Sequence, residues 1–142
     1  MRDELFKPTI RGRGNAGPPP WRPDSIFYPA FFGGPIAAAT LGLLNGRRLG
    51  LARGPLLAIA AAGVACFAVR VAVSTVIDDS SLRLAGSVTG LLVALVVAAV
   101  ERKPFRAFAY RGGKPASLVG PGILAVLGCG LLEAVLIIGV LR

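Results

Sequence analysis

The chain has 142 residues, of which 54% are hydrophobic and only 16% charged, and its mean hydropathy is +0.70. Soluble domains carry charges at about a quarter of their positions, so this composition excludes an ordinary soluble fold and indicates one small membrane domain. The net charge is +9, and the chain has no histidine, which is the commonest general base and metal ligand. Two distant cysteines provide neither a zinc site nor a disulfide framework. We therefore expect no enzymatic activity, no cofactor and no metal site.

The first 25 residues differ in composition from the rest of the chain. They contain glycines, prolines and five basic residues, but few side chains able to form a core. This composition predicts a disordered basic tail over 1–25, with a short polyproline II stretch at Pro18–Pro20. Trp21, Phe27 and Tyr28 stand where an aromatic anchor at the membrane surface belongs.

Four apolar segments follow the tail and account for 83 of the 142 residues: 26–44, 55–77, 84–100 and 118–141. A helix needs about 20 residues to cross the hydrocarbon core of a bilayer. Soluble helices buried in a core are the alternative, but the chain has no amphipathic helix to cover four such segments. The segments predict an all-α membrane protein, a four-helix transmembrane bundle that forms a single domain over 26–142.

The first segment is interrupted near its centre by Gly33-Gly34-Pro35. Pro35 removes a backbone donor, and the paired glycines loosen the helix. Membrane helices tolerate such breaks when neighbouring groups satisfy the freed carbonyls. Segment 26–44 is therefore either a kinked span or a re-entrant hairpin.

The basic residues of the loops distinguish these two models. The loops after the first and third segments are basic, whereas the loop containing Asp78-Asp79 is acidic. Basic loops stay in the cytoplasm. Four spans then place eight basic residues inside and seven outside, while a re-entrant first segment gives thirteen against two. The charges favour the hairpin, and the apolar length favours a span; because 19 uncharged residues normally cross a bilayer, we predict four spans. In both models the second and fourth helices run in the same direction.

Two charged residues interrupt the apolar segments, Arg70 in the second and Glu133 in the fourth. Each lies 15 residues past the start of its segment, at Pro55 and Leu118, and so about 22 Å along its helix at 1.5 Å per residue. Ionised groups at this depth pair or line a cavity. We expect an intramembrane ion pair between Arg70 and Glu133. The pair is either a structural contact that fixes helix pairing or a proton or ion relay with Glu133 as carrier.

Small residues recur at intervals of four on three segments, which places them on one face of each helix. Such residues let helix backbones approach closely in membranes. The third segment carries a helix-packing seam of Gly86, Gly90, Ala94 and Ala98. The corresponding residues of the second and fourth segments are Ala58, Ala62, Cys66, Arg70 and Ser74, and Ala125, Cys129 and Glu133. Ser87 and Thr89 are expected to add hydrogen bonds at the level of the charges.

Two motifs carry a resemblance to a known group of proteins. Phe31-Phe32-Gly33-Gly34-Pro35 and the later turn Arg47-Arg48-Leu49-Gly50 resemble segments of small, uncharacterised bacterial multi-pass membrane proteins. The stretch 111–117 is similar to a Gly-Gly-basic-Ser stretch in that group, although Leu118-Val119 replaces the Trp pair that often follows it. The resemblance covers roughly 26–50 and 105–130. It implies the bacterial inner membrane and supplies no activity.

These observations favour a structural or accessory component of the membrane, which assembles as a homo-oligomer or within a larger membrane complex. The alternative is a small oligomeric transporter or channel that uses the Arg70–Glu133 pair. Polar residues along one face through the full depth would favour transport, but the inner halves of the second and fourth segments are almost entirely apolar. The basic residues are divided among loops beside apolar segments, so we expect membrane lipids and not nucleic acid as partners.

Overall fold

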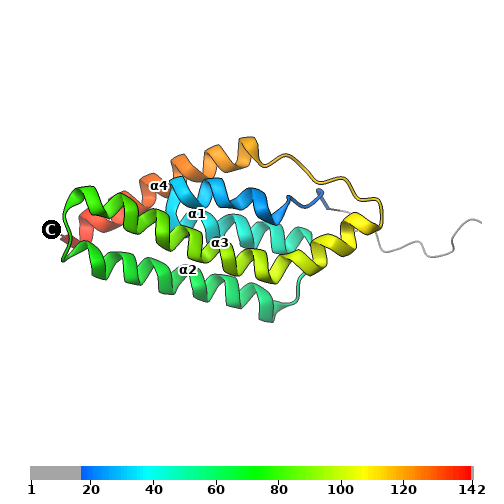
Figure 1. Ribbon diagram of the computed structural model, residues 1–142, viewed down its shortest axis with the longest axis horizontal. Helices are drawn as coiled ribbons and strands as arrows, with labels where there is room; N and C mark the ends of the chain where they lie inside the picture. Colours follow the sequence, from blue (N-terminus) through cyan, green and yellow to red (C-terminus); the bar gives the residue numbers. More distant parts are fainter. Residues whose placement is uncertain (1–16, 142) are drawn as a thin grey trace, which may run out of the picture.

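The computed structural model describes residues 17–141, which form one 3-10 turn and four α-helices (Figure 1). They are η1 (Pro23–Ile26), α1 (Phe27–Arg48), α2 (Arg53–Ser74), α3 (Asp79–Tyr110) and α4 (Val119–Leu141). By total length and composition, four helical stretches are long and apolar enough to cross a membrane, the first of them Pro23–Arg48. The predicted all-α membrane fold is thus confirmed.

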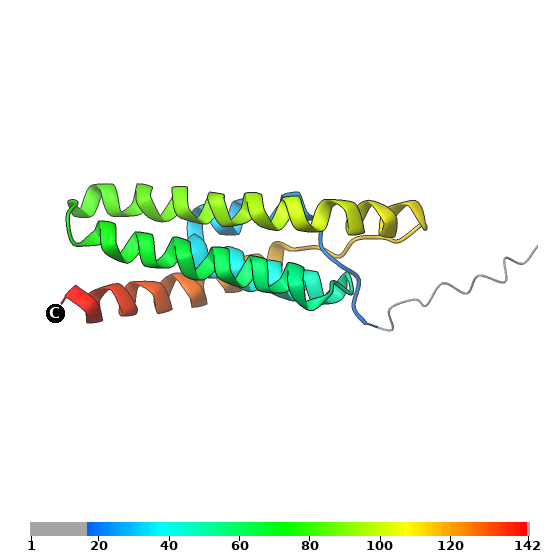
Figure 2. The ribbon, with the colours of Figure 1, turned by 90° about the horizontal axis from the view of Figure 1, so that it is seen from below.

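Helix α1 is a hairpin that reverses direction at Gly34. The backbone of Gly34 has φ 75° and ψ −168°, a conformation that is open almost only to glycine. The two limbs run in opposite directions in both views (Figures 1 and 2), and the Trp21 N–H donates to Asn45 Oδ1 at 2.7 Å, so both limbs return to one end of the bundle. The second limb, 35–48, is about 21 Å long at 1.5 Å per residue, less than the roughly 30 Å of the hydrocarbon core. The predicted kinked span over 26–44 is therefore wrong, and the segment forms the alternative hairpin, because Gly34 reverses the chain direction.

The hairpin and α3 form the centre of the bundle. Helix α1 packs against all three other helices, whereas α2 and α4 scarcely touch each other. The middle of the core contains buried aliphatic side chains from α1, α2 and α3: Ala37, Ala38, Leu41, Ile59, Val93, Ala94 and Val97.

The two ends of the bundle differ in charge. One end, here called the basic end, contains residue 17 and the connections 49–52 and 111–118 (Figure 1). The opposite, acidic end contains the α2–α3 turn with Asp78 and the end of α4. This arrangement matches the hairpin model of the loop charges, in which the tail and both basic loops share a side.

Helix α3 is much longer than the predicted segment 84–100. It begins at Asp79 and continues through Pro104 to Tyr110. Charged side chains at its two ends do not interrupt the backbone hydrogen bonds of a helix, and Pro104 removes only one donor. The helix ends where Gly112 adopts φ 80°, the left-handed conformation that closes many helices. The predicted acidic and basic loops are correspondingly shorter.

The predicted tail boundary at residue 25 is wrong. Trp21 is only 2% exposed, and beside it the Ala116 N–H donates to the Pro20 carbonyl at 3.0 Å. The Arg48 guanidinium lies 3.9 Å from the centre of the Trp21 ring. Trp21 is therefore a core residue and not a surface anchor. Residues 1–16 of the predicted tail lie outside the described part of the chain.

Candidate functional site

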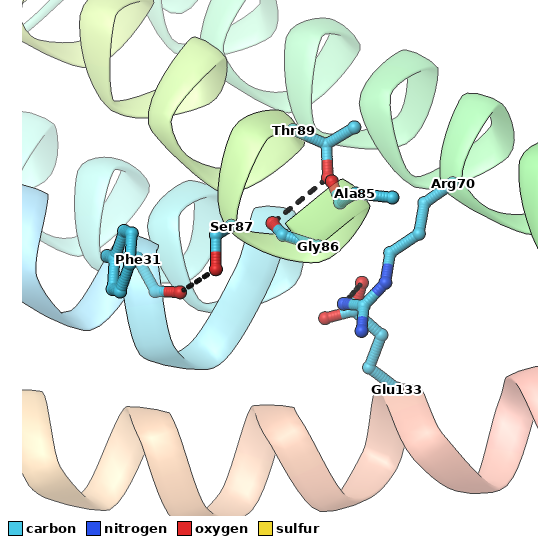
Figure 3. A network of polar contacts seen from close by, with 7 residues as sticks. All are labelled: Phe31, Arg70, Ala85, Gly86, Ser87, Thr89 and Glu133. Carbon is cyan, nitrogen blue, oxygen red and sulfur yellow. Dashed lines mark hydrogen bonds and ion pairs between the residues drawn. The ribbon is translucent and has the colours of Figure 1, made fainter. Parts of the chain in front are cut away.

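Arg70 of α2 and Glu133 of α4 meet at the acidic half of the bundle (Figure 3). Arg70 Nη1 lies 2.5 Å from Glu133 Oε1, and the Glu133 side chain is completely buried while that of Arg70 is 17% exposed. The structure thus brings together the two charges that the sequence places at one depth. Because α2 and α4 hardly touch elsewhere, this ion pair is their principal link.

Glycines make the space that the ion pair occupies. A Cβ atom on Gly34 would lie 2.5 Å from Glu133 Oε2 and 2.6 Å from Arg70 Nη1, and one on Gly86 would lie 2.6 Å from Arg70 Cζ. A Cβ atom on Gly90 would collide with the Ala30 carbonyl of the hairpin. All four residues of the predicted seam on α3 are buried, including Ala94 and Ala98. Its two glycines therefore serve both helix packing and the accommodation of the guanidinium.

The broken backbone of the hairpin is satisfied from α3. Pro35 has no N–H, so the carbonyl of Phe31, four residues earlier, has no helical donor. Ser87 Oγ donates to that carbonyl at 2.9 Å (Figure 3). The Thr89 hydroxyl instead bonds within its own helix, to the carbonyls of Ala85 and Gly86. Of the two hydroxyls expected at this level, only Ser87 therefore joins two helices.

A cleft opens beside the ion pair. It has a volume of about 610 Å³ and is lined by residues from the hairpin tip, α2 and the first turns of α3: Phe31, Phe32, Gly34, Arg70, Ser80, Arg83, Leu84, Gly86 and Ser87. Two of the lining residues are arginines and two are serines, and none is acidic. The cleft lies at the end of the bundle that contains the α2–α3 turn. Its charged lining residues are both cationic, and its other polar side chains are hydroxyls.

A second buried polar cluster lies toward the basic end. Asn45 Nδ2 donates to Glu101 Oε2 at 2.6 Å and to the Trp21 carbonyl at 3.1 Å, and both polar side chains are fully buried. These bonds join α3, the second limb of the hairpin and the segment before η1. Sequence reasoning missed this cluster because Glu101 directly follows an apolar segment, where a charge is expected in a loop. The signal in the sequence is that Glu101 is the first charge after 17 uncharged residues.

The small-residue faces of the other helices are partly as predicted. On α4, Ala125, Cys129 and Glu133 point inward together. On α2 the packing face is rotated, because Ile59 and Gly63 are buried whereas Ala58 is exposed. Cys66 and Cys129 are both free and half-buried. Among residues 17–141, no group of three or more His, Cys, Asp or Glu side chains is arranged to hold a metal ion.

Comparison of the chain with protein-family models, with curated proteins and with solved structures finds no match. The geometry of the two polar clusters and the cleft is therefore the basis for a functional assignment.

Proposed function

We propose that the protein is a non-enzymatic structural or accessory component of a membrane, and of the bacterial inner membrane in view of its motif resemblance. In this role the buried polar residues hold the re-entrant hairpin and the three long helices in one arrangement. The protein then acts by assembling with itself or with a larger membrane complex.

The observation that carries this proposal is the apolar layer between the two polar clusters. Along the hairpin, Ala38 and Leu41 separate the level of Gly34 from Asn45; along α3, Val93, Ala94 and Val97 separate Gly86 from Glu101. A pathway for ions needs polar groups or water through the full depth. Buried ion pairs, in contrast, serve in some proteins to specify one arrangement of segments. The layer therefore supports a role in architecture.

Native mass spectrometry in mild detergent, combined with a flux assay in liposomes, tests the proposal. We expect a defined stoichiometric assembly from the native host, with ion flux no greater than that of empty liposomes. A homo-oligomer that conducts ions, and that stops conducting when Arg70 and Glu133 are both replaced by apolar residues, would contradict the structural role.

The second candidate is a small oligomeric transporter or channel, and one specific observation favours it. The cleft reaches Arg70 and the broken backbone at Gly34, and non-helical backbone at membrane depth is found where it is buried in protein or lines a cavity. In this candidate the cleft is an entrance, and the apolar layer must open. The same flux assay separates the two functions, because only transport requires flux dependent on the Arg70–Glu133 pair.

A further inference from the structure

Two arginines from different helices face the cleft, and one of them, Arg83, has no anionic partner among the described residues. Arg83 is exposed, and its side chain makes no hydrogen bond or ion pair within residues 17–141. Arg70 contacts Glu133 through Nη1, while its Nε is buried without a hydrogen-bond partner in the described part of the chain. A guanidinium has five N–H donors and matches the geometry of carboxylate and phosphate oxygens. Arg83 thus gives the cleft unpaired donors and one net positive charge, and Arg70 adds a guanidinium that is 17% exposed.

The polar groups around these arginines are also suited to an anion. The hydroxyl groups of Ser80 and Ser87 line the cleft, and Gly34 and Gly86 leave its wall free of side chains. Glu133 lies behind Arg70 and is fully buried, so its carboxylate is not a lining group of the cleft. A cation would therefore meet two guanidinium groups, whereas an anion would meet donors from α2 and α3.

The depth of the two arginines corresponds to the surface region of a bilayer. Arg70 is four residues from the end of α2, and Arg83 is four residues from the start of α3. At 1.5 Å per residue each lies about 6 Å, or one helical turn, from the acidic end. Arginines in that region reach lipid phosphates without crossing the hydrocarbon core.

The opposite wall of the cleft is aromatic. Phe31 and Phe32 pack edge to face, with ring centroids 5.1 Å apart. Their side chains are 45% and 71% exposed although both stand on the hairpin near its tip. A ligand with a charged group and an apolar chain would meet arginines on one side and phenyl rings on the other.

From these observations we propose that the cleft binds an anionic phosphate ester through Arg70 and Arg83, with the Ser80 and Ser87 hydroxyls as further donors. The depth of the site and the aromatic wall favour a phospholipid as the source of the phosphate. A soluble phosphate ester entering from the aqueous phase has the same headgroup chemistry. This binding goes beyond the structural role proposed above and does not depend on it.

Native mass spectrometry of the delipidated full chain tests the site. The probes are dioleoylphosphatidylglycerol, dioleoylglycerol, which has the same chains without the phosphate, and glycerol 3-phosphate, which has the phosphate without the chains. The test variant is Arg83→Gln, and the matched control is Arg106→Gln, an exposed arginine at the other end of α3. Circular dichroism verifies that each variant keeps the wild-type helicity.

We expect one phosphatidylglycerol per chain, bound about tenfold more weakly by Arg83→Gln, since a charge-assisted contact is lost. Arg106→Gln should bind as the wild type does, and dioleoylglycerol should not be retained. Binding of glycerol 3-phosphate as tight as that of the lipid, with the same dependence on Arg83, would support the phosphate site and identify the aqueous phase as its source. Equal binding of dioleoylglycerol and phosphatidylglycerol, or equal losses in the two variants, would overturn the proposal.

Discussion

Ser87 donates a hydrogen bond from α3 to the carbonyl of Phe31 in the first limb of the hairpin, at 2.9 Å. That carbonyl is the one which Pro35 leaves without a helical donor, so the bond compensates for the break that allows the chain to turn back. The hairpin and α3 are consequently interdependent. Helix α3 provides the Ser87 hydroxyl and the close approach at its glycines, and α1 provides the Phe31 carbonyl. Replacement of residues at this contact measures how strongly the re-entrant geometry depends on α3.

Removal of the hydroxyl in Ser87→Ala is expected to lower the free energy of unfolding by about 1 kcal/mol, which lies within the values found for hydrogen bonds between membrane helices. Unfolding by SDS titration in mixed micelles, followed by circular dichroism, gives this value. Thr75→Ala is the control, because the Thr75 hydroxyl bonds to the Ala72 carbonyl three residues earlier and links no second helix. The effect of this variant should stay within about 0.5 kcal/mol. Equal losses in the two variants would mean that the Ser87 bond does not hold the hairpin.

Gly34 has both a left-handed backbone and charged neighbours, so Gly34→Ala should be strongly destabilising. The φ 75°, ψ −168° conformation is essentially restricted to glycine and costs a residue with a side chain about 1–3 kcal/mol. The new methyl group would also lie 2.5 Å from Glu133 Oε2. We expect a total loss above about 2 kcal/mol in the same SDS titration.

Gly130→Ala is the matched control for Gly34→Ala. Gly130 lies inside α4, and apart from its chain neighbours and the backbone of its own helix, no described atom lies within 4 Å of the position that its Cβ would take. Alanine is favoured over glycine in a helix interior by up to about 1 kcal/mol, so this variant should be as stable as the wild type or more stable. If Gly34→Ala were equally well tolerated, the reversal at this residue would not be essential to the fold.

The Arg70–Glu133 pair should show strong coupling in a double-mutant cycle. Arg70→Met leaves the fully buried Glu133 carboxylate without its partner, which typically costs about 3–5 kcal/mol. Glu133→Leu leaves the half-buried Arg70 guanidinium unpaired and should cost less, because that group still reaches the cleft. The double variant removes both charges and should recover to within about 1 kcal/mol of the wild type, because apolar residues often replace a buried pair without loss. Losses that simply add in the double variant would show that the two charges do not stabilise each other.

The Arg70–Glu133 contact could be predicted because two charges stand out in apolar segments and the rise of a helix is constant. The same reasoning could not predict whether segment 26–44 forms a kinked helix or a hairpin, since Gly34 and Pro35 are compatible with both. What distinguishes the two is a contact between residues far apart in sequence, the bonds between Trp21 and Asn45.

The Asn45–Glu101 bond was beyond prediction for a related reason. A carboxylate just after an apolar segment is ordinarily solvated, and only the return of the hairpin to the basic end places an amide beside it. The burial of Trp21 is likewise not predictable from its neighbours in the sequence. It depends on contacts with the distant residues Asn45, Arg48 and Ala116. Local sequence patterns therefore do not predict the cluster of Trp21, Asn45 and Glu101, because these residues meet only when the chain reverses at Gly34.

The hairpin makes a definite prediction about the sides of the membrane. If α1 enters and leaves at the basic end, residue 17 shares a side with the α3–α4 connection, and the α2–α3 turn is on the other side. If α1 instead crossed, residue 17 would share a side with the α2–α3 turn. Single cysteines at Gly17, Lys114 and Ser81, introduced into a chain with Cys66→Ala and Cys129→Ala, distinguish these arrangements because all three positions are exposed.

Labelling with a membrane-impermeant maleimide, before and after permeabilisation of bacterial spheroplasts, reports the side of each cysteine. We expect Ser81→Cys to react in intact spheroplasts, while Gly17→Cys and Lys114→Cys react only after permeabilisation, because basic segments stay in the cytoplasm. Reaction of Gly17→Cys together with Ser81→Cys would show that α1 spans the bilayer and that the re-entrant geometry does not persist there. Lys114→Cys serves as the internal reference, since both arrangements place it opposite Ser81.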